Sequence, residues 1–571
     1  MGMRLELSWQ RKLIILFVAT AVLAVAGDYF AGYLLRILLG LEDRVALTPR
    51  MFPRYVAGLD LPAMAPHRWK VAVAGFIGGG AAISGLVLLL AGLFRPRPET
   101  MHGDARFATR GELAKQKMLT ATPTGVVVGK IGKKLIRLSG QQFIILAAPT
   151  RSGKGVGVVI PNLLDYQESM VVLDIKQENF DLTSGWRASQ GQEVYLFNPF
   201  AEDGRTHRWN PLTYVSPNPA QRVSDLAAIA SLLWPDDGGE DQFWSAQSRN
   251  MFMAFALYAC ERWDDDEDLG IPVSMRDVPT IGFLYRLSSG NGTGQDLRDF
   301  YTHLSQEPYL SATARDAFAN LLSQSDKTFP SITAGFKQPL GPWLNPYVDA
   351  ATSADDFLLT DVRKKRMTVY IGILPNKLAE SRIIVNLFFS QLINVNTREL
   401  PQNNPALKHQ CLLLMDEFTA IGKVEIITSA VAYMAGYNIR LLPIIQSLSQ
   451  LDSVYGAEVS RTLVTNHALQ IVYAPREQKD ATDYSEMLGY RTVRRTNLSK
   501  GRETTRNHSE ERRALMLPQE LKALGPDREI IFYEGIPHPI RCQKIRYYQD
   551  PYFTARLLPA AGVPRLQVKA R

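Results

Sequence analysis

Residues 142–160 read QFIILAAPTRSGKGVGVVI. The apolar run 142–146 predicts a buried strand, and the run 156–160 can open a helix. A strand, a glycine-bearing turn and a helix form the setting of a phosphate-binding loop. Backbone N–H groups of the turn and the ammonium of Lys154 would bind the phosphate oxygens. We therefore predict a cofactor-binding loop that consists of Ala148, Pro149, Thr150, Arg151, Ser152, Gly153, Lys154 and Gly155.

The loop departs at two positions from the pattern G-x-x-x-x-G-K-[ST]. Ala148 stands where the first glycine is usual, which costs little if its backbone avoids a positive φ. Gly155 replaces the hydroxyl that usually ligates Mg²⁺, so we expect magnesium to depend on Asp416, water and the phosphates. Read alone, the segment also suits an ordinary strand, turn and helix. The interpretation as a nucleotide-binding loop therefore requires an acidic partner elsewhere in the chain.

A second segment ends in two carboxylates. Residues 410–415 read QCLLLM, an apolar run typical of a parallel strand buried on both faces, and Asp416 and Glu417 follow directly. We predict Asp416 as the metal ligand and Glu417 as the catalytic residue that orients or deprotonates the attacking water. The alternative is that Asp416 caps a helix that begins at Phe418.

Two further strand ends carry polar groups. Residues 170–173 end in Asp174, which we predict as a cofactor-binding residue that supports the metal or the lysine, although such a carboxylate often only caps a turn. Residues 441–445 end in Gln446, a catalytic residue placed to sense the γ-phosphate. Ligands of doubly wound sheets lie at the carboxyl ends of the strands. Together with catalytic Lys154, these residues predict an α/β fold with a site for ATP and Mg²⁺.

Composition limits the class of protein. The chain has 571 residues, 46% of them apolar and 21% charged, which supports packed cores and excludes wholesale disorder. Cys260, Cys411 and Cys542 lie far apart, so they exclude a disulfide scaffold and a paired-cysteine metal site and favour a cytosolic location for most of the chain. The net charge of +8 permits an anionic partner without identifying one.

Two N-terminal apolar runs predict a membrane anchor in residues 1–98. Residues 71–94 carry no charge and can cross the roughly 30 Å hydrocarbon layer, and their glycines permit close approach of another helix. An earlier run gives a first span at about 13–35, with residues 36–69 as a periplasmic loop. The alternative is a cleaved secretory signal, because Ala24-Val25-Ala26 resembles a cleavage site. Both readings leave the large C-terminal region in the same compartment.

The middle of the chain has helical character. Apolar residues recur at helical spacing in three segments, 221–234, 241–263 and 311–325. We expect an all-α insertion over about 215–355. It also holds two acidic runs, Asp236-Asp237 with Glu240-Asp241 and Asp264 to Asp268. We interpret these runs as solvated loops that could also attract basic tails of protein substrates.

The C-terminal part contains a basic stretch. Residues 491–513 hold eight Lys or Arg against three Glu, a net charge of +5, with no Phe, Trp or Tyr among them. We interpret the stretch as a mobile basic loop that is either solvated or in contact with a DNA backbone. Such a contact would be independent of base sequence and sensitive to salt. We predict the final strands at about 530–533 and 545–548.

Together these segments resemble the type IV secretion coupling proteins, the TraG/TraD-like ATPases of bacterial conjugation. The resembling stretches are 102–108 (HGDARFA), 148–157 (APTRSGKGVG), 172–176 (VLDIK), 414–418 (LMDEF) and 443–447 (PIIQS). Gly155 fits this family better than it fits phosphate loops in general. The arginine that some relatives offer across a subunit interface has no secure counterpart, since we interpret the candidates Arg440 and Arg461 as surface ion-pair residues.

The resemblance implies a RecA-like P-loop NTPase domain in two halves, 99–214 and 356–571, around the all-α insertion, with a two-helix membrane anchor. It favours a multi-pass ATPase of the bacterial inner membrane, with its ATPase region in the cytoplasm. Such a protein couples ATP hydrolysis to recruitment and translocation of a DNA–relaxase complex, protein substrates or both through a type IV secretion channel. The implied partners are single-stranded DNA or its relaxase complex, protein substrates, other channel subunits, the lipid bilayer and further copies in a homo-hexamer.

Two other functions remain open from the sequence. The first is a substrate receptor that uses nucleotide only to set its conformation. The second is a chromosome-segregating DNA translocase, although such proteins usually carry more membrane spans and a separate C-terminal DNA-reading domain. Glu417 discriminates the receptor from the motor, because a docking switch does not need a carboxylate that activates water.

Overall fold

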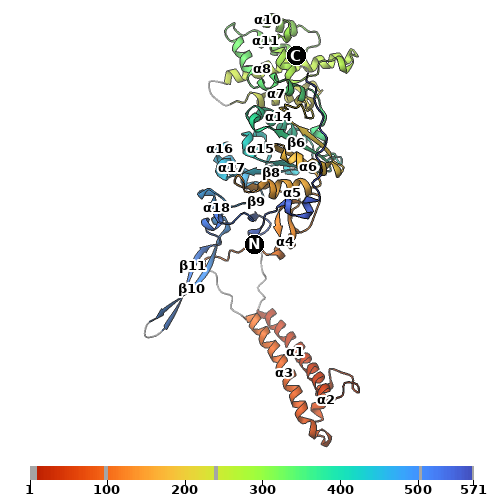
Figure 1. The fold of residues 1–571 in the computed structure, drawn as a ribbon, viewed down its shortest axis with the longest axis vertical. Coiled ribbons are helices and arrows are strands. Elements are labelled where there is room, and N and C mark those ends of the chain that lie inside the picture. The colour runs from red at the N-terminus through yellow and green to blue at the C-terminus, as the bar shows by residue number, and fades with distance from the viewer. Residues whose placement is uncertain (1–8, 95–100, 237–241, 501–503, 569–571) are drawn as a thin grey trace. The chain divides into compact units, whose positions relative to one another are not determined.

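The computed structural model describes residues 9–94, 101–236, 242–500 and 504–568 (Figure 1). The chain divides into two compact units, Met1–Met101 and His102–Arg571. The first unit contains two long apolar helices that pack along each other, α1 (Trp9–Leu38) and α3 (Arg68–Phe94). Both are long and apolar enough to cross a membrane. The segment expected as a loop between them contains two short helices, α2 (Met51–Ala57) and the 3-10 helix η1 (Pro62–His67).

Glycines of α3 allow its neighbours to approach closely. A Cβ at Gly78 would lie 2.6 Å from the carbonyl oxygen of Gly27 on α1, and one at Gly75 would lie 2.7 Å from the ring of Phe52 on α2. Neither position therefore accepts a side chain without movement of the neighbour. Close approach at Gly75 and Gly78 thus occurs within one chain.

The second unit is built on an 11-stranded mixed sheet. Its strands are β1 (Val126–Ile131), β2 (Lys134–Leu138), β3 (Ile144–Ala147), β4 (Ser169–Ile175), β5 (Glu193–Phe197), β6 (Met367–Ile373), β7 (Cys411–Met415), β8 (Ile439–Ile445), β9 (Leu469–Val472), β12 (Arg528–Tyr533) and β13 (Ile540–Gln543). Their order is β2-β1-β13-β12-β9-β3-β8-β7-β4-β6-β5. The strands from β9 to β5 pair in parallel, and the other four continue the sheet in antiparallel pairing. The predicted α/β fold class is confirmed.

The central parallel strands are buried on both faces, as their apolar sequences predict. All residues of β3, β7 and β8 are buried. Alternate residues of β3 enter two different cores: Ile145 lies in the core that includes α14 (Leu378–Asn396), and Ile144 and Leu146 lie in the core that includes α5 (Ile160–Asp165). This two-sided packing fixes the strands, so that the segments after β3, β7 and β8 meet at one edge of the sheet.

The strand predicted at 545–548 is wrong. The last strand is β13, and the predicted segment runs into the 3-10 helix η11 (Tyr547–Gln549). Asp550 caps the short helix α20 (Pro551–Thr554) that follows directly, with its side chain accepting a hydrogen bond from the N–H of Tyr552. The apolar residues of this segment imitate a strand, but the cap and the proline turn the chain into a helix.

Helices fill the connection between β5 and its parallel neighbour β6, and no strand occurs among its described residues. They are α7 (Pro219–Leu233), α8 (Gln242–Asp268), α9 (Ile281–Leu287), α10 (Leu297–Ser305), α11 (Ala312–Leu322), α12 (Phe329–Lys337) and α13 (Pro346–Ala351). The interpretation of Asp264 to Asp268 as a loop is wrong, because these residues end α8, where Asp264 pairs with Arg222 at 2.6 Å. Of the other acidic run, Asp237, Glu240 and Asp241 lie outside the described residues.

The basic stretch 491–513 is not a loop, and this interpretation is also wrong. It lies in a separate antiparallel pair of strands, β10 (Tyr490–Lys500) and β11 (Thr504–Ala514) (Figure 1). The two strands pair without a shift in register, and residues 501–503 lie outside the described part of the chain. Polar residues at successive positions of this sequence remove the apolar alternation by which a strand is usually predicted.

Candidate functional site

The predicted phosphate loop follows β3 and leads into the π-helical turn η2 (Gly155–Val159), which α5 continues. Arg151 and Gly153 have positive φ values of 60° and 86°, whereas Lys154 is right-handed with a φ of −58°. Where left-handed and right-handed residues alternate, successive backbone N–H groups point into one concavity that can bind an anion. This arrangement is called a nest. Ala148 avoids a positive φ, so the absence of a glycine there causes no strain.

The structure brings the loop lysine and the two predicted acids together. Strand β8 lies between β3 and β7, so these side chains meet across its end. Lys154 Nζ lies 2.7 Å from Glu417 Oε1 and 3.5 Å from Asp416 Oδ1. The side chains of Lys154, Glu417 and Asp416 are 11%, 26% and 17% exposed, so solvent screens these ion pairs only weakly.

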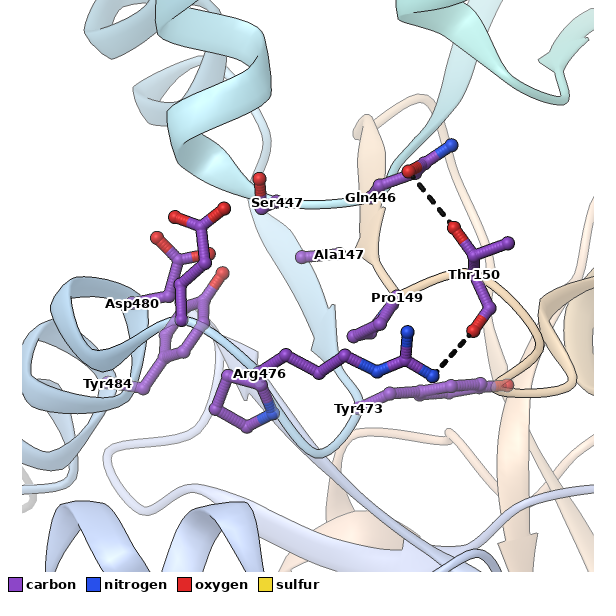
Figure 2. A pocket seen from close by; sticks show the side chains of 11 residues that line it. Ala147, Pro149, Thr150, Gln446, Ser447, Tyr473, Arg476, Asp480 and Tyr484 are labelled. Atoms are coloured by element: carbon purple, nitrogen blue, oxygen red, sulfur yellow. Dashed lines mark hydrogen bonds between the residues drawn. The ribbon is translucent and has the colours of Figure 1, made fainter.

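A chain of hydrogen bonds continues from the acids back to the loop. Gln446 Nε2 donates to Glu417 Oε2 at 3.0 Å. Thr150 Oγ1 donates to Gln446 Oε1 at 3.1 Å (Figure 2). The amide of Gln446 therefore uses its donor toward the acid and its acceptor toward the loop. Lys154, Glu417, Gln446 and Thr150 form one connected network at the carboxyl edge of the sheet.

Burial and Lys154 act in opposite directions on the two carboxylates. Burial raises the pKa of Glu417, but its hydrogen bond and charge interaction with Lys154 outweigh this, and the pKa lies below its ordinary value. For Asp416 burial dominates and raises the pKa despite the nearby ammonium. Of the two acids, the carboxylate that Lys154 stabilises more strongly is therefore that of Glu417. Its backbone is left-handed, with a φ of 57°, a conformation that costs of order 1–3 kcal/mol in non-glycine residues and clusters at functional sites.

The residues present fit a nucleotide with Mg²⁺. Ser152 Oγ and Asp416 Oδ1 are buried and have no hydrogen-bond partner among the described residues. A Cβ at Gly155 would meet no atom within 4 Å, so the position that usually carries a hydroxyl is open. Because Mg²⁺ usually keeps several waters and takes only one or two carboxylates, Asp416 is a sufficient protein ligand beside phosphate oxygens.

The structure gives Asp174 a contact other than the predicted one. Its carboxylate is fully buried and accepts hydrogen bonds from the N–H groups of Phe180 at 2.8 Å and Asn179 at 3.3 Å, at the start of α6 (Glu178–Ser189). Burial raises the pKa of Asp174 to about 7 against these hydrogen bonds. In this structure the Asp174 carboxylate thus binds the first free N–H groups of α6, and its predicted role toward the metal or the lysine stays a prediction.

Two cations that the sequence analysis did not single out contact the loop. Arg476, which follows β9, donates to the carbonyl oxygen of Thr150 at 2.9 Å (Figure 2). Lys544, which follows β13, donates to the carbonyl oxygen of Ser152 at 3.3 Å. Each is a single cation in a connecting segment, and no local pattern marks it. A pocket of about 130 Å³ beside the loop is lined by residues that include Pro149, Thr150, Gln446, Tyr473, Arg476 and Asp480.

The two arginines considered for a subunit interface lie elsewhere. Arg440 on β8 is fully buried, which corrects its interpretation as a surface residue. Its guanidinium donates to three backbone carbonyls, those of Thr124, Leu138 and Gln142. A guanidinium can be buried when its N–H groups are satisfied in this way. Arg461 is exposed on α17 (Ala457–Thr465).

Known proteins are similar to this chain over most of its length. Residues 100–569 match the model of the family described as Type IV secretory system Conjugative DNA transfer. The chain is 32% identical to Protein VirD4 of Rhizobium rhizogenes over 482 residues, which cover 82% of this chain and 69% of that protein. It is 28% identical to the conjugal transfer protein TraG of Escherichia coli over 531 residues, which cover 83% of this chain and 80% of TraG.

Solved structures with the same fold include the bacterial conjugative coupling protein TrwB without its first 70 residues, with a TM-score of 0.56 and 18% identity over 80% of this chain and 96% of that one. TrwB in complex with the ATP analogue ADPNP has a TM-score of 0.54, and TrwB in complex with ADP and Mg²⁺ one of 0.55, both with 17% identity over 80% of this chain and 98% of TrwB. This likeness shows the fold, a RecA-like P-loop domain. From the family match and the identity to VirD4, this chain belongs to the Type IV secretory system conjugative DNA transfer family, the coupling proteins of type IV secretion.

Proposed function

We propose that this coupling protein binds ATP with Mg²⁺ at residues 148–155, Asp416, Glu417 and Gln446, and hydrolyses ATP to drive substrates through a type IV secretion channel. The observation that carries the proposal is the 2.7 Å ion pair between Lys154 and Glu417. It joins a lysine on a phosphate-binding loop to a carboxylate that can activate water. The TrwB structures that hold ADPNP, or ADP and Mg²⁺, support the choice of ligands.

Each residue has a distinct role in this proposal. The N–H groups of the loop and the ammonium of Lys154 bind the phosphate oxygens. When bound, Mg²⁺ supplies positive charge at the β- and γ-phosphate oxygens, with Asp416 as its protein ligand. Glu417 orients the attacking water or accepts its proton. Gln446 is hydrogen-bonded to both Glu417 and Thr150. A γ-phosphate that contacts either of these residues therefore also affects Gln446.

We place the protein in the bacterial inner membrane. The two apolar helices α1 and α3 are long enough to span it, and the segment between them would then lie in the periplasm. The ATPase region would lie in the cytoplasm. We keep the division into two halves of a nucleotide-binding domain, 99–214 and 356–571, around a helical insertion, 215–355. The family supports a DNA–relaxase complex as cargo, with protein substrates, channel subunits and a homo-hexamer as further partners.

The variant Lys154→Ala tests the nucleotide site. Loss of the ammonium removes charge-assisted bonds to phosphate, so we expect DNA transfer by cells that carry only this variant to fall to background, while the protein stays in the membrane fraction. Lys408→Ala is a matched control, because Lys408 is exposed and precedes β7 at the end opposite Asp416. Normal transfer by Lys154→Ala would discredit the assigned site.

The substrate receptor is the alternative from another class. Such a receptor binds nucleotide but needs no sustained turnover. Steady-state phosphate release by the full chain in nanodiscs, with and without single-stranded DNA, separates the two functions. Turnover stimulated by DNA supports the motor, whereas binding of ATP without turnover supports the receptor. Membership of a conjugative family argues against a chromosome-segregating translocase.

A further inference from the structure

Two cationic side chains hold alternate carbonyl groups of the phosphate loop. Arg476 Nη2 donates to the carbonyl oxygen of Thr150 at 2.9 Å (Figure 2), and Lys544 Nζ donates to that of Ser152 at 3.3 Å. Neither cation follows a strand that carries the acids. Arg476 follows β9, which pairs in parallel with β3, so the segment after β9 reaches the loop that follows β3. Lys544 reaches the loop from the segment after β13.

These bonds determine where the loop N–H groups point. In a planar trans peptide, the C=O group and the following N–H group point in opposite directions. A bond that fixes the Thr150 carbonyl on Arg476 therefore aims the N–H of Arg151 away from Arg476. In the same way, the bond from Lys544 to the Ser152 carbonyl aims the N–H of Gly153. Arg151 and Gly153 are the two residues of the nest with positive φ.

Arg151 needs such support more than Gly153 does. A residue with a Cβ meets a steric cost in the left-handed region that glycine does not meet. The φ of Arg151 is 60°, so its conformation must be stabilised by surrounding contacts. The hydrogen bond from Arg476 acts on the peptide unit directly before Arg151. It is the contact best placed to offset this cost.

Lys544 is itself held in place. Its Nζ lies 3.6 Å from the centroid of the Tyr473 ring, which is fully buried, so the ammonium makes a cation–π contact. Tyr473 packs directly against the turn after the loop, because a Cβ at Gly157 would lie 2.4 Å from the tyrosine hydroxyl. The lysine, the ring and the helical turn thus form one packed support on the side of the loop that carries the Ser152 carbonyl.

We propose that Arg476 and Lys544 are positioning residues, which hold the phosphate loop in its anion-binding conformation through the Thr150 and Ser152 carbonyls. The inference rests on the proposed nucleotide site and deepens it. Neither residue touches the reacting atoms in this role. Both act from the same subunit that carries Lys154, so the loop is organised before a nucleotide binds and ATP does not have to order it.

The test measures binding of a fluorescent ATP analogue to the full chain in nanodiscs. Lys544→Met removes the donor but keeps an unbranched side chain, and we expect Kd to rise about 10-fold. Lys544→Arg retains a donor and is expected to stay within about threefold of wild type. Arg476→Met is expected to raise Kd only about threefold, because Arg476 is exposed and solvent screens its contact.

Turnover distinguishes positioning from catalysis. For both Met variants we expect KM for ATP to rise while kcat changes by less than about twofold, because Glu417 and Gln446 are untouched. The matched controls are Arg461→Met and Lys408→Met, which replace exposed cations elsewhere on the chain. They are expected to keep the wild-type KM.

A second-site variant tests the proposed reason for Arg476. Glycine adopts a positive φ without steric cost, so in an Arg151→Gly background the loop no longer needs Arg476 to hold this conformation. We expect Arg151→Gly with Arg476→Met to bind the analogue within about twofold of Arg151→Gly alone. Equal effects of Arg476→Met in both backgrounds would show that Arg476 does not support the strained peptide.

The outcomes separate this inference from the proposed function. Wild-type Kd in both Met variants, with binding abolished by Lys154→Ala, would overturn the positioning role and leave the nucleotide site intact. Retained binding by Lys154→Ala would instead overturn the proposed site itself. An equal loss of affinity for the ATP analogue in Lys544→Met and Lys544→Arg, with a lower melting temperature in both variants, would show an effect on folding. This result would also overturn the positioning role.

Discussion

Replacement of Glu417 by Gln should separate nucleotide binding from hydrolysis. Lys154 Nζ lies 2.7 Å from the Glu417 carboxylate, so the ammonium must loosen this contact when it binds a phosphate. Glutamine has the same shape but no charge, and it releases the lysine. The variant should therefore bind ATP more tightly than wild type, although it loses the group that activates water.

The size of both effects follows from the contact. A partly buried ion pair contributes more than the roughly 0.2–1 kcal/mol of an exposed pair, and we take about 1.5 kcal/mol because Glu417 is 26% exposed. Since about 1.4 kcal/mol corresponds to a factor of ten, we expect Kd for ATP to fall about 10-fold. Loss of a general base typically lowers turnover by about 10²–10⁴-fold.

The assay combines two measurements on the full chain in nanodiscs, equilibrium binding of a fluorescent ATP analogue and steady-state phosphate release. Glu425→Gln is the matched control, because this carboxylate is 72% exposed at the start of α15 (Glu425–Ala430). It should change neither quantity by more than about twofold. Weaker binding by Glu417→Gln, or hydrolysis at the wild-type rate, would refute the reasoning from the ion pair.

Three further substitutions probe other parts of the structure. Gly155→Ser adds a hydroxyl where there is open space, so ATP affinity should depend more strongly on Mg²⁺, as titrations with and without the metal would show. Asp174→Ala removes the cap of α6 and should lower the free energy of unfolding by about 1–2 kcal/mol in denaturation curves, with a smaller loss for Asp174→Asn. Burial lowers the pKa of His467 to about 4, so between pH 6.5 and 4 the unfolded chain binds a proton that the folded chain does not. The contribution of neutral His467 to the free energy of unfolding should therefore be fully present above pH 6.5 and fall by about 3 kcal/mol toward pH 4. His467→Gln should abolish this loss. Parallel plots of unfolding free energy against pH for the wild type and the variant would exclude His467 as its origin.

The strand ends could be predicted because their signals are local. A continuous apolar run such as 410–415 specifies a strand buried on both faces, and the polar residue that follows must lie at the carboxyl edge. The meeting of Lys154 with Glu417 then follows from one assumption, that both strands belong to one parallel sheet. For Asp174 the same logic gives the edge of the sheet but not the contact that the structure adds, in which N–H groups of the next helix donate to the buried carboxylate.

Other features could not be predicted because tertiary contacts decide them. Lys544 reaches the phosphate loop only because the antiparallel strands β12 and β13 extend the sheet beyond β9, and no pattern near Lys544 indicates this. The charge of Arg440 suggests a surface position, yet the carbonyls of Thr124, Leu138 and Gln142, which are distant from Arg440 in the sequence, satisfy its guanidinium inside the protein. In both cases the partner is a backbone carbonyl, which leaves no trace in the pattern of side chains.

Because β8 lies between β3 and β7, Gln446 at the end of β8 can contact residues that follow both neighbouring strands. Lysine and acid come from strands that are not adjacent, and the amide at the end of β8 connects Glu417 to Thr150 across the gap. A nucleotide that draws Lys154 away from Glu417 therefore changes the surroundings of the same amide that contacts the loop. Gln446→Ala should lower the turnover rate without a matching loss of ATP affinity, because the nest and Lys154 remain while Glu417 loses its support. Equal losses of binding and turnover in this variant would mean that Gln446 only stabilises the loop.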